Sequence, residues 1–257
     1  MLVNTGKVVI LYVSNHLNQN TIMKKLKVIT LGLCAALVVS CSTKTGTGAL
    51  IGTGAGTFVG GIIGKIAGNT AVGAAVGAAV GAGTGALIGR HMDKVKAETE
   101  AQLAETATVE EVTDNNGLKA VKVTFDSGLL FTTGSASLST SAKSSLSKFA
   151  NNVLKKNASV DVNVYGYTDN QGWKNSTAEQ SAQKNLNLSQ ERAQSVASYL
   201  MACGAATSQI AAVEGLGESN PVADNSTEAG REQNRRVEVY LYASQEMIDA
   251  ANNGTLQ

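Results

Sequence analysis

The stretch VDVNVYG, residues 160–166, alternates apolar and polar side chains, which is typical of a β-strand with one buried face. Before it, apolar residues recur with helical spacing over 139–156. After it, a second apolar helix face runs to Gly204, which suits a helix end, and Ser189 suits the N-cap of that helix. The sequence therefore predicts a strand between two amphipathic helices.

Three further segments around this centre have strand patterns. Residues 108–125 alternate on both sides of Asn116-Gly117, which is typical of a β-hairpin. Residues 211–217 and 236–242 predict two more strands. Together these elements predict an α+β fold over 107–243, a mixed sheet with helices on one face, followed by a C-terminal tail at 244–257.

Charge and composition exclude several function classes. Residues 1–40 hold four of the 21 basic residues and no acidic residue, so 41–257 carries a net formal charge of −3. A nucleic-acid partner is not expected, because such proteins present a basic face. With two histidines and three cysteines in the chain, we expect no metal, no cofactor and no catalytic set. Cys203 is expected to be a small core residue.

In the N-terminal part, a basic cluster at 23–27 precedes an apolar stretch at 28–39, and Ser40 precedes Cys41. This order resembles a bacterial lipoprotein signal. The resemblance implies cleavage before Cys41, acylation of that residue (palmitate among the acyl groups), and a true start at Met23. The alternative is an uncleaved membrane anchor, although the stretch is shorter than the ~20 apolar residues that span a bilayer. Residues 41–47 would then form a lipidated linker.

Glycines recur every fourth residue over 48–68 and again over 73–89. This spacing places them on one helix face, a packing pattern known from helices in lipid. The segment resembles the glycine zippers of envelope proteins and predicts a helical hairpin over 48–90. Three interpretations stay open: a hairpin that inserts into the membrane or forms a homo-oligomer, a packed soluble hairpin, and a flexible spacer. Residues 91–106 predict a polar, exposed helical linker.

Five motifs follow one another in the C-terminal part: FTTGSA (131–136), GYTDNQG (166–172), NLNLSQERA (185–193), GLGESNP (215–221) and NRRVEV (234–239). Together they resemble the OmpA-like peptidoglycan-binding domain.

The resemblance implies a β/α/β/α/β-β fold that binds peptidoglycan stem peptides noncovalently at the free end of diaminopimelate. Asp169 would hold the ammonium group, and Arg192, in the first turn of its helix, would hold the carboxylate. The alternative is that these two residues form a structural ion pair. Asn234 and Arg236 are expected to brace the fold. Further candidates for the pocket wall or its support are Phe131, Thr132, Thr168, Asn170, Asn185 and Arg235.

The sequence departs from the family pattern in two places. Residues 173–184 lengthen the segment between Asp169 and Asn185, where Trp173 would cover a ligand or shield the base of its own loop. Tyr167 stands where the family often has histidine. We expect binding to persist, with an altered ligand preference.

These features together predict a non-catalytic lipoprotein that tethers the outer membrane to the cell wall, with its C-terminal domain in the periplasm. The protein would be attached to the membrane by the lipid on Cys41 and, in one interpretation, also by residues 48–89. The alternative function is a membrane-inserting or oligomerising glycine-zipper assembly that the wall-binding domain locates. An envelope enzyme is the third hypothesis, and it lacks a supporting motif.

Overall fold

The computed structural model describes residues 57–58, 82–114, 116–132 and 134–256. The chain divides into two units, 1–53 and 54–257, and every described residue belongs to the second. The predicted signal, the lipidation of Cys41 and the glycine repeat before residue 82 therefore lie outside the described residues.

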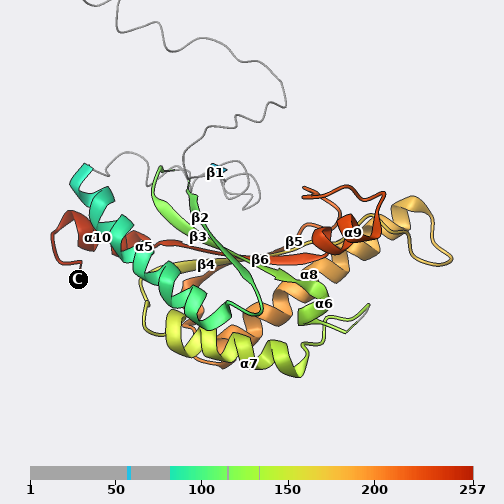
Figure 1. Ribbon diagram of the computed structural model, residues 1–257, viewed down its shortest axis with the longest axis horizontal. Helices are drawn as coiled ribbons and strands as arrows, with labels where there is room; N and C mark the ends of the chain where they lie inside the picture. The colour runs from blue at the N-terminus through green and yellow to red at the C-terminus, as the bar shows by residue number, and fades with distance from the viewer. Residues whose placement is uncertain (1–56, 59–81, 115, 133, 257) are drawn as a thin grey trace, which may run out of the picture. The chain divides into compact units, whose positions relative to one another are not determined.

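A six-stranded mixed sheet forms the centre of the second unit, in the order β1-β2-β3-β6-β4-β5 (Figure 1). β2 and β3 form the predicted antiparallel hairpin, in which Val109 lies opposite Val123. β6 lies antiparallel between β3 and β4, and β5 runs parallel to β4. The strand bounds are β1 Thr57–Phe58, β2 Thr108–Thr113, β3 Lys119–Asp126, β4 Val160–Gly166, β5 Ile210–Gly215 and β6 Arg236–Ala243.

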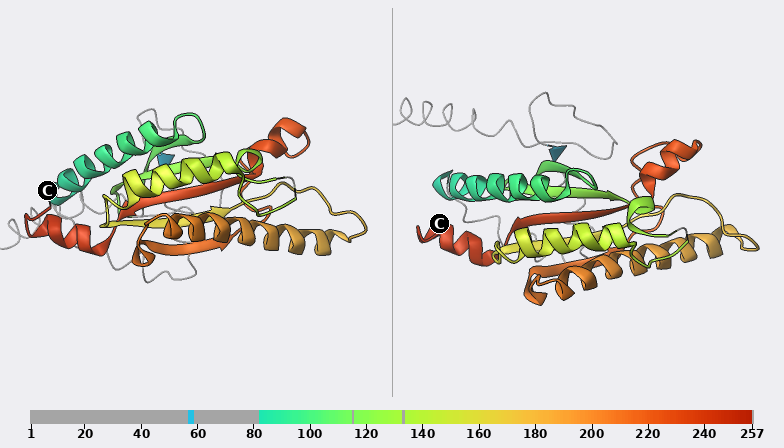
Figure 2. Two further views of the ribbon diagram at one scale, coloured as in Figure 1. Left: turned by 90° about the horizontal axis from the view of Figure 1, so that it is seen from below. Right: turned by 60° about the horizontal axis from the view of Figure 1, so that its bottom comes forward.

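The long helices pack against one face of this sheet (Figure 2). Inward side chains of β3, β4 and β6, such as Val123, Val162 and Val239, share one core with apolar residues of α5, α7 and α8. This arrangement confirms the predicted α+β fold. The helix bounds are α5 Ala82–Leu103, α6 Ser127–Leu130, α7 Thr140–Phe149, η1 Ala150–Leu154, α8 Ala178–Ala202, η2 Thr207–Gln209, α9 Glu228–Asn234 and α10 Gln245–Asn252.

The prediction of an exposed helical linker over 91–106 is wrong. α5 runs without a break across residue 90 and buries Ile88, Met92, Val95 and Leu103, which share one helix face and belong to the main core. Lys119 of β3 also forms an ion pair with Asp93 of α5, at 2.7 Å between Nζ and Oδ1. Charged residues dominate the rest of this segment, and their number hides the narrow apolar stripe in the sequence pattern. No described helix combines the length and hydropathy that membrane crossing requires.

α8, the predicted helix that ends near Gly204, begins earlier than predicted. Its N-cap is Thr177, whose hydroxyl accepts from the backbone N–H of Gln180 while the Gln180 side chain accepts from that of Thr177. Ser189 lies inside α8, where its hydroxyl donates to the carbonyl of Leu186 and accepts from the N–H of Gly217. Residues 178–184 are therefore helical and belong to α8.

Two glycines allow α8 to approach the strand ends that carry the site. A Cβ at Gly166 would collide with the carbonyl of Ser189, and one at Gly215 would collide with the backbone of Gln190. Because neither glycine has a side chain, α8 crosses directly over the C-terminal ends of β4 and β5. The loop that follows β4 is thereby held beside the middle of the helix.

Candidate functional site

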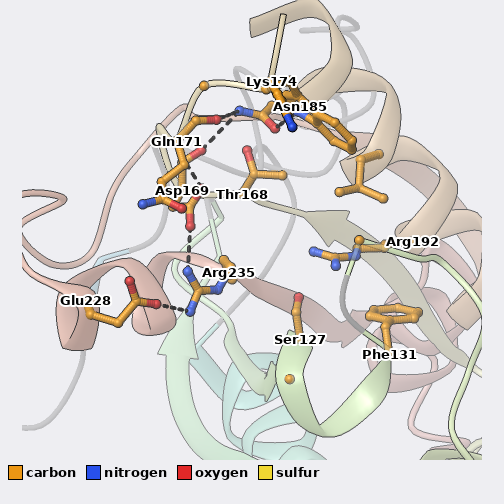
Figure 3. A pocket seen from close by; sticks show the side chains of 15 residues that line it. Ser127, Phe131, Thr168, Asp169, Gln171, Lys174, Asn185, Arg192, Glu228 and Arg235 are labelled. Carbon is orange, nitrogen blue, oxygen red and sulfur yellow. Dashed lines mark hydrogen bonds and ion pairs between the residues drawn. The ribbon is translucent and has the colours of Figure 1, made fainter. Parts of the chain in front are cut away.

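A pocket of about 540 Å³ opens where the loop after β4, the middle of α8 and the starts of α6 and β6 meet (Figure 3). Its wall combines charged side chains with the apolar groups of Phe131 and Leu188. The residues that line it are Ser127, Gly128, Phe131, Gly134, Thr168, Asp169, Gln171, Gly172, Trp173, Lys174, Asn185, Leu188, Arg192, Glu228 and Arg235.

Arg192 brings a buried cation to this pocket. Its side chain is 5% exposed, its Nε donates to the carbonyl of Ser135 at 3.1 Å, and its guanidinium lies 5.2 Å from the ring centre of Phe131. Within the described part of the chain, no carboxylate comes within 4.0 Å of it. Burial lowers the pKa of Arg192, the charge of Arg235 lowers it further, and Asp169 raises it. Arginine nevertheless stays protonated in proteins, so the guanidinium of Arg192 brings to the pocket a positive charge that is not paired with a carboxylate of the described residues.

Asp169 pairs with Arg235 instead of Arg192. The distance from Asp169 Oδ2 to Arg235 Nη1 is 2.6 Å, and Asp169 Oδ1 accepts from the N–H of Gln171 at 3.1 Å. Arg235 Nη2 donates to Glu228 at 2.8 Å. Burial would lower the pKa of Arg235, but the hydrogen bonds and charges of Glu228 and Asp169 raise it overall. The alternative hypothesis of an Asp169–Arg192 ion pair is therefore wrong, although both side chains face one pocket.

Two hydroxyl groups in the pocket wall lack a protein partner. Among the described residues, Thr168 Oγ1 and Ser127 Oγ are buried without a hydrogen bond, and both residues line the pocket. A buried hydroxyl without a partner costs free energy, so each of these groups is suited to a polar ligand or a water molecule.

Asn185 supports the pocket. Its Oδ1 accepts from the indole N–H of Trp173 at 2.7 Å, and its Nδ2 donates to the carbonyl of Gln171 and to Glu218. These bonds use both N–H groups and one lone pair of the amide. Its side chain therefore fixes the loop after β4 to α8.

The pocket brings together most of the predicted site. Six of the eight candidates line it, whereas Thr132 and Asn170 are exposed and do not. Arg192 lies in the middle of α8 and not in the first turn, because Thr177 begins the helix. The backbone N–H groups of a helix start are therefore not beside its side chain, and the predicted help from them is wrong.

Several lining residues were not predicted. Leu188 lies three residues after Asn185 and four before Arg192, so helical spacing alone could have placed it on the same face. Ser127 follows the end of β3, and Glu228 begins α9, and no local pattern links either to Asp169. In the described ranges, no group of three or more His, Cys, Asp or Glu side chains could hold a metal ion.

A second buried arginine nearby braces the fold. Arg236 is 3% exposed, and its Nε lies 2.8 Å from Oε1 of Glu238, whose other oxygen accepts from the hydroxyl of Tyr240. Its guanidinium stacks 3.7 Å from the ring centre of Tyr167. Asn234 accepts from the N–H groups of two loop residues and donates to a loop carbonyl, which confirms its predicted bracing role.

Comparison with known proteins gives matches for two parts of the chain. Residues 130–235 match the OmpA family, and residues 23–93 match the YMGG-like Gly-zipper. The probable lipoprotein YiaD of Escherichia coli is 47% identical over 35% of this chain and 36% of its own length. The peptidoglycan-binding protein ArfA of Mycobacterium bovis is 46% identical over 34% of this chain and 24% of its own length.

The matched segments thus span about a third or less of these curated relatives. Among solved structures, a MotB-like protein of Desulfovibrio vulgaris has a TM-score of 0.51 at 22% identity, covering 63% of this chain and 96% of that one, which shows a shared fold. The chain therefore carries an OmpA family domain at residues 130–235 and a YMGG-like Gly-zipper at residues 23–93.

Proposed function

We propose that the protein binds peptidoglycan noncovalently, by holding the free end of a diaminopimelate residue in the pocket around Arg192. That end carries an ammonium and a carboxylate on one carbon atom. A pocket that recognises it needs one fixed cation and one fixed anion at the same hollow, together with hydroxyl groups that complete the hydrogen bonds.

The buried guanidinium of Arg192 carries this proposal. It has no carboxylate partner among the described residues, it cannot lose its proton, and it faces a pocket large enough for an amino acid. A buried charge without a partner is costly, whereas a bidentate pair with a carboxylate is strong. A ligand carboxylate would supply the missing negative charge.

Asp169 would hold the ammonium group. Each of its oxygens accepts one protein hydrogen bond, and a carboxylate has acceptor capacity beyond that. The hydroxyls of Thr168 and Ser127 would bind the remaining polar atoms of the ligand. Arg235 holds Asp169 in place through its ion pair, and Glu228 in turn pairs with Arg235, without either being required to touch the ligand.

The wider role that we propose is a tether between the outer membrane and the cell wall. Lipid on Cys41 would provide one attachment and the pocket the other, and two attachments on one molecule reinforce each other through effective concentration. One relative is named a probable lipoprotein and another a peptidoglycan-binding protein, which supports the lipid attachment and the wall attachment respectively. For the alternative, a glycine-zipper assembly, the supporting observation is the match of residues 23–93 to the YMGG-like Gly-zipper, and most glycines of that segment lie outside the described residues.

Sedimentation with purified, insoluble peptidoglycan tests the proposal. The full chain is used, because α5 packs on the same sheet as the rest of the domain. The parent protein should pellet, and Arg192→Met and Asp169→Asn should stay in the supernatant. Arg90→Gln and Asp249→Asn change exposed charges outside the pocket and should pellet like the parent. If both pocket variants pellet as well as the controls, the assignment is wrong.

A further inference from the structure

One wall of the pocket is built by the segment that lengthens this chain between Asp169 and Asn185. It comprises the loop at 173–177 and the first turns of α8, residues 178–184. Trp173, the only tryptophan of the chain, lies in this loop, lines the pocket and is 37% exposed. A large aromatic side chain left partly exposed at a pocket wall has apolar surface to offer a ligand.

The position of Trp173 is fixed by α8. Its backbone N–H donates to the hydroxyl of Ser181 at 3.0 Å, and its indole N–H donates to Asn185 at 2.7 Å. Ser181 and Asn185 lie one helical turn apart, and both are buried. Lys184 adds an ammonium group 5.8 Å from the centre of the indole ring. The loop is therefore anchored at two points, and the ring occupies a defined place in the wall.

An apolar surface leads from Arg192 toward this ring. Asn185, Leu188 and Arg192 share one face of α8, and both Leu188 and Trp173 line the pocket. Asn185, which holds the indole, lies about 10 Å along the helix axis from Arg192, at 1.5 Å per residue. Figure 3 shows Arg192 and Asn185 on the same side of the pocket. If a ligand places its carboxylate at Arg192 and carries a hydrocarbon arm, that arm would therefore meet Leu188 first and then the indole.

We propose that Trp173 and Leu188 form an apolar subsite that packs against the methylene arm of diaminopimelate. The subsite makes the pocket select an amino acid with a long hydrocarbon arm over a short one that carries the same charged end. This inference rests on the proposed function and adds a determinant of specificity from the lengthened segment. Each methylene group that the two side chains remove from water contributes roughly fourfold in affinity.

A purely structural role for Trp173 makes a different prediction. If the indole only holds Asn185, its removal loosens the loop that carries Asp169 and weakens every ligand with the charged end. If it packs on the arm, its removal weakens only the ligand that has an arm. Leu188 separates the two roles further, because no side-chain hydrogen bond can be lost there.

The test is a set of NMR titrations of the full chain in detergent micelles with meso-diaminopimelate and with D-alanine, which has the charged end but no arm. The parent should bind meso-diaminopimelate at least about tenfold more tightly. Trp173→Ala and Leu188→Ala should each weaken that ligand about fivefold and leave D-alanine within about twofold. Leu186→Ala is the matched control, since Leu186 is exposed on the same helix and does not line the pocket.

Equal affinity of the parent for the two ligands would overturn the inference. So would variants that leave meso-diaminopimelate unchanged, or that weaken both ligands alike. A parent that binds neither ligand would overturn the proposed function itself, and the subsite with it. Should Trp173→Ala fail to fold, the comparison of Leu188→Ala with Leu186→Ala decides the question.

Discussion

Two buried arginines in the same domain have opposite surroundings. Arg236, on β6, has a carboxylate at 2.8 Å, an aromatic ring beneath it and backbone carbonyls as further acceptors. Arg192, on α8, has one backbone carbonyl and an aromatic ring, and no carboxylate among the described residues. Because one buried cation is fully satisfied and the other is open to a pocket, we propose that Arg236 serves the fold and that Arg192 serves a ligand.

The largest expected effect comes from breaking the satisfied pair. Glu238→Gln removes the negative charge beside Arg236 and leaves a buried cation without compensation, which costs about 3–5 kcal/mol. The free energy of unfolding, measured by urea titration with circular dichroism, should fall by that amount, while the folded variant still pellets with peptidoglycan. A loss of less than about 1 kcal/mol would show that Arg236 does not need its partner.

Replacing the open arginine should have the opposite effect on stability. Arg192→Met removes a desolvated charge without a counter-ion, so the free energy of unfolding should stay unchanged or rise by about 1 kcal/mol. Affinity for peptidoglycan should fall about 10- to 100-fold, because the ligand carboxylate loses a charged hydrogen-bonding partner. Destabilisation like that of Glu238→Gln would mean that Arg192 is a structural residue, and the contrast would disappear.

Asp169 lies between these extremes. It pairs with Arg235, which is partly exposed, so Asp169→Asn should lower the free energy of unfolding by about 1–2 kcal/mol. It should also weaken wall binding, because the ammonium group loses its anion. Urea titration and sedimentation of the same preparation measure both effects. Binding equal to that of the parent would leave Asp169 with a structural role alone.

The smallest expected effect concerns a partly buried carboxylate, which can lose its charge by taking up a proton. Burial raises the pKa of Asp161, on β4 and outside the pocket, to about 6, whereas an unfolded chain keeps it near its usual ~3.9. Because the pKa of Asp161 is higher in the folded protein, the contribution of this group to the free energy of unfolding is greatest below pH 4. That contribution is lost as the pH rises through 6. Asp161→Asn should therefore be more stable than the parent at pH 7.5, on the order of 1 kcal/mol after allowing for partial exposure, with the gain vanishing by pH 4.

The control for this last variant is Asp249→Asn, an exposed change on α10 that is measured at the same pH values. A profile of Asp161→Asn that parallels the parent would mean that the carboxylate is not desolvated. The comparison matters for Arg192 because a carboxyl group can neutralise itself by taking up a proton, whereas a guanidinium cannot lose one.

Local patterns predicted much of the fold. Alternation of apolar and polar residues in 160–166 and on both sides of Gly117 predicted β4 and the β2–β3 hairpin, because neighbouring residues of a strand point to opposite faces. The prediction that β4 buries one face only is wrong, because Asn163 and Tyr165 on its other face are buried as well. α5 was assigned wrongly as an exposed helix because Met92 and Val95 are its only large apolar residues between Ile88 and Leu103, and the charged residues around them suggest a solvated helix.

The sequence predicted most residues of the site but not which of them contact one another. Motifs placed Asp169 and Arg192 near one another, but the partner of Asp169 is Arg235, which is 66 residues away and reaches it because of the way β6 inserts between β3 and β4. Such a choice of partner depends on sheet topology and on side-chain packing. Ser127 and Glu228 joined the pocket for the same reason, and no short-range pattern marks them.

The most direct test of the account compares two ligands that differ only at the group Arg192 would bind. Trp173, the single tryptophan, lines the pocket, so its fluorescence can follow titrations with a stem peptide that contains meso-diaminopimelate and with the same peptide amidated at the free carboxylate of that residue. The account predicts that the parent prefers the carboxylate at least about tenfold and that Arg192→Met has no preference. Equal binding of both ligands by the parent, or an unchanged preference in Arg192→Met, would contradict it.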